Sequence, residues 1–128
     1  DFLKEKNIKN VQLAVSAPFH CKLMSKATEI MKIEIENANF KNFQNILISN
    51  VTANEVLNKD DLKKLLIDQI ENRVRWRESI NFMIEKGVQS FTEIGPGKVL
   101  SGLIKRIDKN VKIRTINNID DIKNLKNE

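Results

Sequence analysis

The segment from residue 88 to residue 116 constrains the fold more than any other part of the chain. Residues 88–94 have the composition of a β-strand, a Gly-Pro-Gly turn follows at 95–97, and an apolar stripe predicts a helix from about Lys98. Alternating apolar residues then predict another strand at 111–116. Two strands joined by a crossover helix pair in parallel within one sheet. The segment therefore predicts an α/β fold with mainly parallel strands and crossover helices.

The rest of the chain continues the alternation of strands and helices. Short strands are predicted at 11–17 and at 46–51, and the second is apolar enough to be buried on both faces. Asp60 or Asp61 is the expected N-cap of one helix, and Gly102 inside another predicts close packing at that point. Helices with apolar stripes are predicted at 21–38, 60–72, 76–86, 98–107 and, more weakly, 119–125.

Length and composition indicate one globular domain. The chain has 128 residues, of which 41% are hydrophobic and 30% charged, which is typical of a soluble protein. Its apolar runs fall far short of the roughly 20 residues that span a bilayer. The single cysteine, Cys21, cannot form an internal disulfide and suggests a reducing compartment: the cytoplasm, or an organellar stroma in a eukaryote. A metal site is not expected, because one histidine and one adjacent cysteine supply too few ligands.

The net charge of +5 leaves two interpretations open. It could serve an acidic partner such as nucleic acid, a phosphate-bearing cofactor or an acidic carrier protein. The lysines are scattered, however, and the aromatic residues do not alternate with basic ones, so solvated lysines are favoured. Residues 95–98 (GPGK) weakly resemble a phosphate loop but lack the full pattern; a tight turn is favoured, although free N–H groups at the following helix start could hold an anion.

His20 is the only histidine, and it follows a predicted strand and Pro18. Open α/β sheets build their sites at strand ends, and imidazole exchanges a proton near neutral pH. A lone histidine is more often a surface or packed residue than a catalyst, so this position alone does not decide its role.

Three separated motifs add a family resemblance. They are residues 15–20 (VSAPFH), 69–76 (QIENRVRW) and 93–100 (EIGPGKVL). As a set, in this order and approximate spacing, they resemble malonyl-CoA:acyl carrier protein transacylases. The resemblance covers residues 11–107 and corresponds to the C-terminal portion of that family. Cys21, where the family usually has serine, and Arg73, where it often has proline, depart from the pattern.

The resemblance implies roles for three residues. His20 is expected to be the general base that activates a serine, and the Gly-x-Ser-x-Gly elbow that presents this serine precedes the region seen here. Gln69 matches the position whose main-chain carbonyl accepts a hydrogen bond from the histidine, while its side chain is expected to face solvent. Phe19 resembles the malonyl-selecting form of the motif, because a bulky ring there would crowd a 2-methyl branch.

The resemblance also implies an activity and its partners. The expected enzyme is an [acyl-carrier-protein] S-malonyltransferase of fatty acid biosynthesis, which moves a malonyl group from coenzyme A to the phosphopantetheine thiol of acyl carrier protein through a serine acyl-enzyme. No bound cofactor is expected, since the coenzyme A thioester is a substrate. The expected partners are malonyl-CoA, acyl carrier protein and the remaining N-terminal part of the enzyme, with no nucleic acid and no membrane.

The family has a large domain similar to α/β hydrolases, with a small ferredoxin-like domain inserted in it. Residues 1–20 are therefore expected to end the small subdomain, and residues 21–128 to form the C-terminal part of the large domain. Because the chain starts at Asp1 without a methionine and lacks the elbow, we expect a fragment that is inactive alone.

Three alternatives concern the basic residues and the activity. If the segment is extended, Arg73, Arg75 and Arg77 point the same way and form a basic strip, either a solvated edge or a contact for an acidic carrier protein or coenzyme A phosphates. The chain could instead be a small basic module that binds nucleic acid or protein without catalysis. It could also be a stably folding fragment with no activity of its own.

Overall fold

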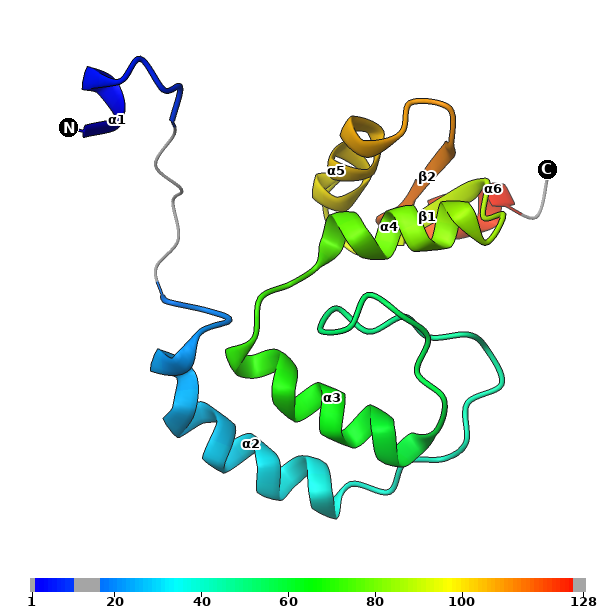
Figure 1. Ribbon diagram of the computed structural model, residues 1–128. Coiled ribbons are helices and arrows are strands. Elements are labelled where there is room, and N and C mark those ends of the chain that lie inside the picture. Colours follow the sequence, from blue (N-terminus) through cyan, green and yellow to red (C-terminus); the bar gives the residue numbers. More distant parts are fainter. Residues whose placement is uncertain (1, 11–16, 126–128) are drawn as a thin grey trace.

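Figure 1 shows the computed structural model of the protein, which describes residues 2–10 and 17–125. The elements, in chain order, are α1 (Phe2–Glu5), the 3₁₀ helix η1 (Lys22–Met24), α2 (Ser25–Asn37), α3 (Lys59–Glu71), α4 (Trp76–Glu85), β1 (Ser90–Ile94), α5 (Val99–Ile107), β2 (Lys112–Ile116) and α6 (Ile119–Leu125). Residues 11–16, which make up most of the first predicted strand, lie outside the described residues. The helices predicted from sequence are confirmed within one residue at each end, except that the helix predicted at 21–38 begins as η1 and becomes α2 only at Ser25.

The predicted strand–helix–strand unit is confirmed. β1 and β2 pair in parallel, with Ser90 opposite Lys112 and Ile94 opposite Ile116, and α5 makes the crossover between them. Gly95 and Gly97 have φ values of 137° and 101°, which L side chains rarely adopt. The Gly-Pro-Gly turn thus lets the chain leave β1 and start α5 within a few residues.

The main hydrophobic core lies between α4, α5 and the two strands (Figure 1). Ile80, Ile104 and Val111 form its buried centre, with Ile80 at 0% exposure. Partly buried apolar side chains pack around them: Trp76, Met83, Ile84, Phe91, Ile107 and Ile113. Except for Phe91, which lies in the strand predicted at 88–94, these residues lie on the apolar positions predicted at 76–86, 98–107 and 111–116. The stripe predicted at 98–107 is buried only in part, because Val99, Leu100 and Leu103 are 72%, 42% and 36% exposed.

A second unit is the helix pair α2–α3, whose helices lie side by side (Figure 1). Lys63 of α3 donates to the Glu36 carbonyl at the end of α2 over 2.8 Å. The predicted N-cap of α3, Asp60 or Asp61, is wrong. Asn58 is the N-cap, and its Oδ1 accepts from the main-chain N–H groups of both aspartates. The asparagine satisfies first-turn donors, its Nδ2 also donates to Asp61 Oδ2 at 2.7 Å, and both acidic residues lie near the helix N-terminus, where negative charge is favourable.

The predicted strand at 46–51 is wrong. Ile48 and Glu55 form only an isolated antiparallel bridge, and the chain turns sharply between them. The Ser49 N–H donates to the Asn54 carbonyl (3.0 Å), and the Ala53 N–H donates to the Ser49 carbonyl (2.8 Å). The Ser49 hydroxyl also accepts from the Val51 N–H at 3.1 Å. The hydrogen bonds of Ser49 and Asn54 stabilise a turn here, and they outweigh the β-propensity of the apolar run.

Two packing predictions also fail within the described chain. Ile30 and Met31, on the apolar stripe of the helix predicted at 21–38, are 66% and 44% exposed. Gly102 faces open space, since a Cβ added there would meet no other atom within 4 Å. The described residues therefore leave part of the apolar surface of α2 and α5 uncovered.

Ile80→Ala tests the core. Removing a fully buried isoleucine side chain should lower the free energy of unfolding by about 2–5 kcal/mol, because it loses apolar burial and leaves a cavity. Urea unfolding followed by the fluorescence of Trp76 measures this change. Ile33→Ala, at a side chain 59% exposed on α2, is the matched control and should change stability by less than about 0.5 kcal/mol. Equal losses in the two variants would contradict this placement of the core.

Candidate functional site

His20 lies in an exposed turn just before η1. The Phe19 N–H donates to the Ala17 carbonyl at 3.0 Å, and Cys21 Sγ donates to the Pro18 carbonyl at 3.2 Å. The cysteine therefore bonds to the turn itself rather than forming a dyad with the histidine. His20 has φ 59°, in the left-handed region, where a residue other than glycine persists only if its surroundings hold it.

The His20 ring is held by the end of α3. Nδ1 lies 2.8 Å from the main-chain carbonyl oxygen of Gln69. Because α3 ends at Glu71, this carbonyl is among the last four of the helix and has no N–H partner within it. A carbonyl oxygen only accepts, so Nδ1 must carry the hydrogen and donate it. In the neutral ring Nε2 then bears the lone pair, which is the form that a general base requires.

The Gln69 side chain makes a separate contact. Its Oε1 accepts from Asn50 Nδ2 at 3.3 Å, and Gln69 is half-buried, so its side chain does not face solvent as the helical pattern suggests. Asn50 belongs to the turn that replaces the strand predicted at 46–51. Sequence reasoning missed Asn50, because its partner in α3 is 19 residues away and no local pattern indicates the contact.

Several main-chain donors of the Gly-Pro-Gly turn and the start of α5 already have partners within the protein. The Glu93 carboxylate accepts from the N–H groups of Leu100 (3.1 Å) and Ser101 (2.8 Å), and Asn117 Oδ1 accepts from the Gly97 N–H (2.8 Å). The Ser101 hydroxyl and main-chain N–H, followed by the Leu100 N–H, hold the pKa of Glu93 below its ordinary value. The structure thus favours the tight-turn interpretation over a phosphate loop.

The three arginines do not form one basic strip. Arg75 Nε and Arg73 Nη2 lie 3.3 and 3.5 Å from the same Glu78 carboxylate oxygen. Arg77 lies in the first turn of α4, where the extended geometry has ended. One carboxylate therefore pairs with two of the three guanidinium groups, while Arg77 lines a surface that Glu78 also borders.

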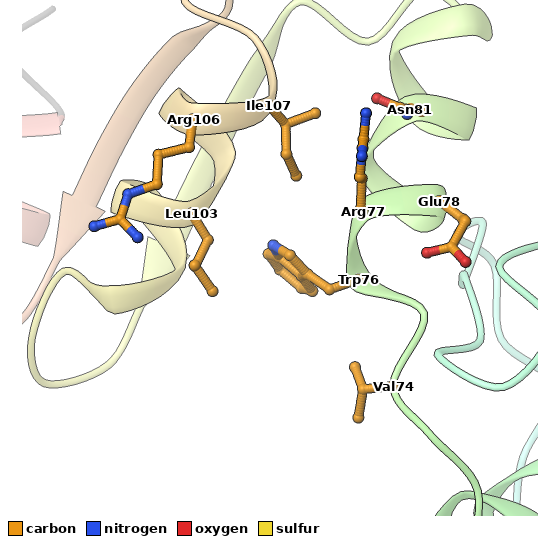
Figure 2. A pocket seen from close by; sticks show the side chains of 8 residues that line it. All are labelled: Val74, Trp76, Arg77, Glu78, Asn81, Leu103, Arg106 and Ile107. Carbon is orange, nitrogen blue, oxygen red and sulfur yellow. The ribbon is translucent and has the colours of Figure 1, made fainter. Parts of the chain in front are cut away.

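That surface is a groove of about 650 Å³ between α4 and α5. In Figure 2 the Trp76 ring projects from α4 toward Leu103 and Ile107 of α5. Arg77 and Arg106 also line the groove. Phe19, His20 and Gln69 do not line it, so the three predicted site residues form a separate location.

Within residues 2–10 and 17–125, no group of three or more His, Cys, Asp or Glu side chains is arranged to hold a metal ion. Among these same residues, every helix is too short or too polar to cross a bilayer.

Similar proteins of known sequence and of known structure carry the same description, that of a transacylase. The chain is 43% identical over 113 residues to the malonyl CoA-acyl carrier protein transacylase of Bacillus subtilis. It superposes with a TM-score of 0.87 on the crystal structure of the transacylase of that name from Clostridium perfringens, at 36% identity over 98% of this chain. The chain therefore matches the C-terminal portion of malonyl-CoA:acyl carrier protein transacylases.

The match to these transacylases covers only part of them. The aligned region is 88% of this chain but 36% of the Bacillus subtilis protein, and 40% of the Clostridium perfringens chain. A further transacylase, with a TM-score of 0.86 and 35% identity, was solved in complex with its type II PKS acyl-carrier protein. No family model matches the chain. These relatives do not favour the basic binding module considered from the charge.

Glu93→Gln tests the carboxylate at the start of α5. Its lowered pKa means that the ionised group stabilises the folded protein above the ordinary carboxyl pKa, and that this contribution is lost as the pH falls through the folded value. The variant should melt at a lower temperature than the parent near roughly pH 7, and the difference should shrink toward about pH 3.

Thermal unfolding by circular dichroism measures both temperatures. Glu29→Gln, at an exposed carboxylate on α2, is the control and should give a smaller difference near neutral pH. A Glu93→Gln difference that stays constant across this pH range would argue against the role of Glu93 in capping α5.

Proposed function

We propose that the chain is the C-terminal part of an [acyl-carrier-protein] S-malonyltransferase. This enzyme transfers a malonyl group from coenzyme A to the phosphopantetheine thiol of acyl carrier protein, in fatty acid biosynthesis. The observation that carries the proposal is the His20–Gln69 contact of 2.8 Å, found in a chain that matches this family. It leaves Nε2 of an exposed imidazole free to accept a proton.

His20 acts as the general base in two half-reactions. Its Nε2 takes the proton of a serine hydroxyl supplied by the N-terminal part of the enzyme, while the serine oxygen attacks the malonyl thioester carbonyl. The tetrahedral intermediate expels the coenzyme A thiolate, which receives the proton from the imidazolium. The phosphopantetheine thiol then attacks the malonyl-serine ester, again with His20 as base, and regenerates the serine.

Gln69 and Phe19 support this reaction without taking part in bond exchange. The Gln69 carbonyl fixes the Nδ1–H tautomer and stabilises the imidazolium that forms in each half-reaction. A main-chain carbonyl performs the part that a carboxylate has in an Asp-bearing triad. Phe19, next to His20 and 58% exposed, places its ring where it limits the substituent at C2 of the acyl group.

The domain organisation and setting follow from the same proposal. Residues 1–20 end a small ferredoxin-like subdomain, and residues 21–128 form the C-terminal part of a large α/β-hydrolase-like domain. The exposed apolar side chains of α2 and α5 are consistent with cover from the rest of that domain. The enzyme needs no bound cofactor, its partners are malonyl-CoA and acyl carrier protein, and it works in the cytoplasm or, in a eukaryote, an organellar stroma.

His20→Ala tests the general base. A chimera that joins this chain to the N-terminal part of the Bacillus subtilis transacylase supplies the serine. The variant should lower kcat for malonyl transfer by at least about 100-fold, because a positioned base contributes that much to proton transfer. Transfer of radiolabelled malonyl from coenzyme A to acyl carrier protein measures the rate. Lys22→Ala, at the exposed start of η1, is the control, and unchanged turnover in His20→Ala would refute the role.

Phe19→Ala tests acyl selectivity in the same chimera. Removing the ring should raise kcat/KM for methylmalonyl-CoA relative to malonyl-CoA by about 10-fold or more, since a pocket discriminates one methyl group by roughly this factor. Competition between the two thioesters measures the ratio. Leu23→Ala, which removes a nearby side chain that is 77% exposed, is the control. A ratio that stays the same in Phe19→Ala would remove Phe19 from the specificity site.

A further inference from the structure

We propose that Asn50 is a positioning residue for His20. Its side-chain amide holds Gln69, and Gln69 in turn presents its main-chain carbonyl to the imidazole. This inference rests on the proposed function, because it assigns Asn50 a part in orienting the base. Two bonds carry it: Asn50 Nδ2 to Gln69 Oε1 at 3.3 Å, and His20 Nδ1 to the Gln69 carbonyl at 2.8 Å.

The main chain of Asn50, and the turn that contains it, are held in place by Arg75. Its carbonyl accepts from the Arg75 N–H at 2.9 Å, which joins it to the residue just before α4. Arg75 Nη1 donates to the Thr52 carbonyl at 3.1 Å, so the arginine binds the same turn a second time. The turn is anchored from within as well, because Ser49 and Ala53 are only 6% and 5% exposed. Because this turn is held by several contacts, the Asn50 side chain can restrain the end of α3 to which it bonds.

The end of α3 needs that restraint. Helix ends fray, because their last carbonyls have no intrahelical partner. Asn72 closes part of this end, since its N–H and Nδ2 both donate to the Asp68 carbonyl at 3.1 and 2.7 Å. Neither bond touches the Gln69 carbonyl, which is the acceptor for His20. The Asn50 amide is the contact that restrains Gln69 by its side chain, and it does so from an element outside the helix.

The Asn50 contact should affect the fraction of molecules in which His20 can act as a base. His20 stands in a left-handed turn on the protein surface, where few contacts fix its ring. If the Gln69 carbonyl moves, the imidazole loses its preference for the Nδ1–H tautomer, and a smaller fraction of molecules has an Nε2 lone pair facing the serine. Loss of the Asn50 bond should therefore lower kcat and leave KM nearly unchanged, as expected for a group that acts on a base rather than on substrate.

The experiment uses the fact that the chain has one histidine and one tryptophan. In the ¹⁵N-histidine-labelled 128-residue chain, two-bond and three-bond ¹H–¹⁵N correlations report the tautomer of His20 alone. We expect the Nδ1–H form to dominate in the parent chain once the ring is neutral, and to lose that dominance in Asn50→Leu, which keeps the branching at Cγ and removes the amide. Fluorescence of Trp76 verifies that the α4–α5 core remains folded.

Two further variants keep the test decisive. Gln69→Leu removes Oε1 but keeps the main-chain carbonyl, so it should reproduce the tautomer change even if Asn50→Leu fails to fold. The double variant should add little to either single one, because both break the same bond. Asn54→Leu is the matched control: its exposed side chain bonds only to the carbonyl of Thr52 in its own turn, and it should leave the tautomer unchanged.

The outcomes separate this inference from the proposed function. A folded Asn50→Leu or Gln69→Leu chain that keeps the Nδ1–H form overturns the role of Asn50 and leaves the His20 base intact. If the parent chain lacks the Nδ1–H form, the His20–Gln69 contact is contradicted, and the basis of the proposed function is lost. In the chimera, Asn50→Leu should lower kcat by about 10-fold, the lower end of the loss seen when hydrogen-bond partners of metal-ligating histidines are removed, with little change in KM.

Discussion

The last turn of α3 presents a main-chain carbonyl that has no partner within the helix, and the arrangement around His20 depends on it. A helix cannot satisfy its own last carbonyls, so each needs a partner from elsewhere. Here the Gln69 carbonyl finds the imidazole of a residue 49 positions earlier in the chain. An obligatory feature of helix geometry thus becomes the acceptor that selects one tautomer of a histidine.

The turn at residues 49–53 connects this helix end with the rest of the molecule. It contacts α3 through Asn50 and the start of α4 through Arg75, which link the helix pair to the α4–α5 core. Buried Ser49, Ala53 and Val56 show that this connection is packed rather than loose. This loop therefore joins the α4–α5 core to the helix whose last turn contacts His20.

Sequence patterns predicted the elements that depend on periodicity. The apolar stripes of residues 76–86 and 98–107 and the alternation at 111–113 identified the core around Ile80, because those residues bury one another within the described chain. The same reasoning failed for residues 46–51, where local bonds from Ser49 outweigh β-propensity. It also failed for Ile30, which is exposed on the part of α2 that the described residues leave uncovered.

The candidate site was predictable only through motifs. No local rule indicates that His20 meets residue 69, since the contact depends on how α3 packs beside η1 and α2. The resemblance supplied that pair, and the structure adds Asn50, which neither periodicity nor the motifs identified. Long-range contacts between polar side chains carry no sequence period, so they become visible only when the chain is folded.

The left-handed backbone at residue 20 restricts which side chains can occupy that position. Glycine, asparagine, aspartate and histidine tolerate this conformation best, whereas β-branched residues are strongly disfavoured. Among those tolerated, histidine is the one whose ordinary chemistry exchanges a proton near neutral pH. The left-handed turn therefore favours a small set of residue types at position 20, and histidine is the one in that set that can exchange a proton near neutral pH.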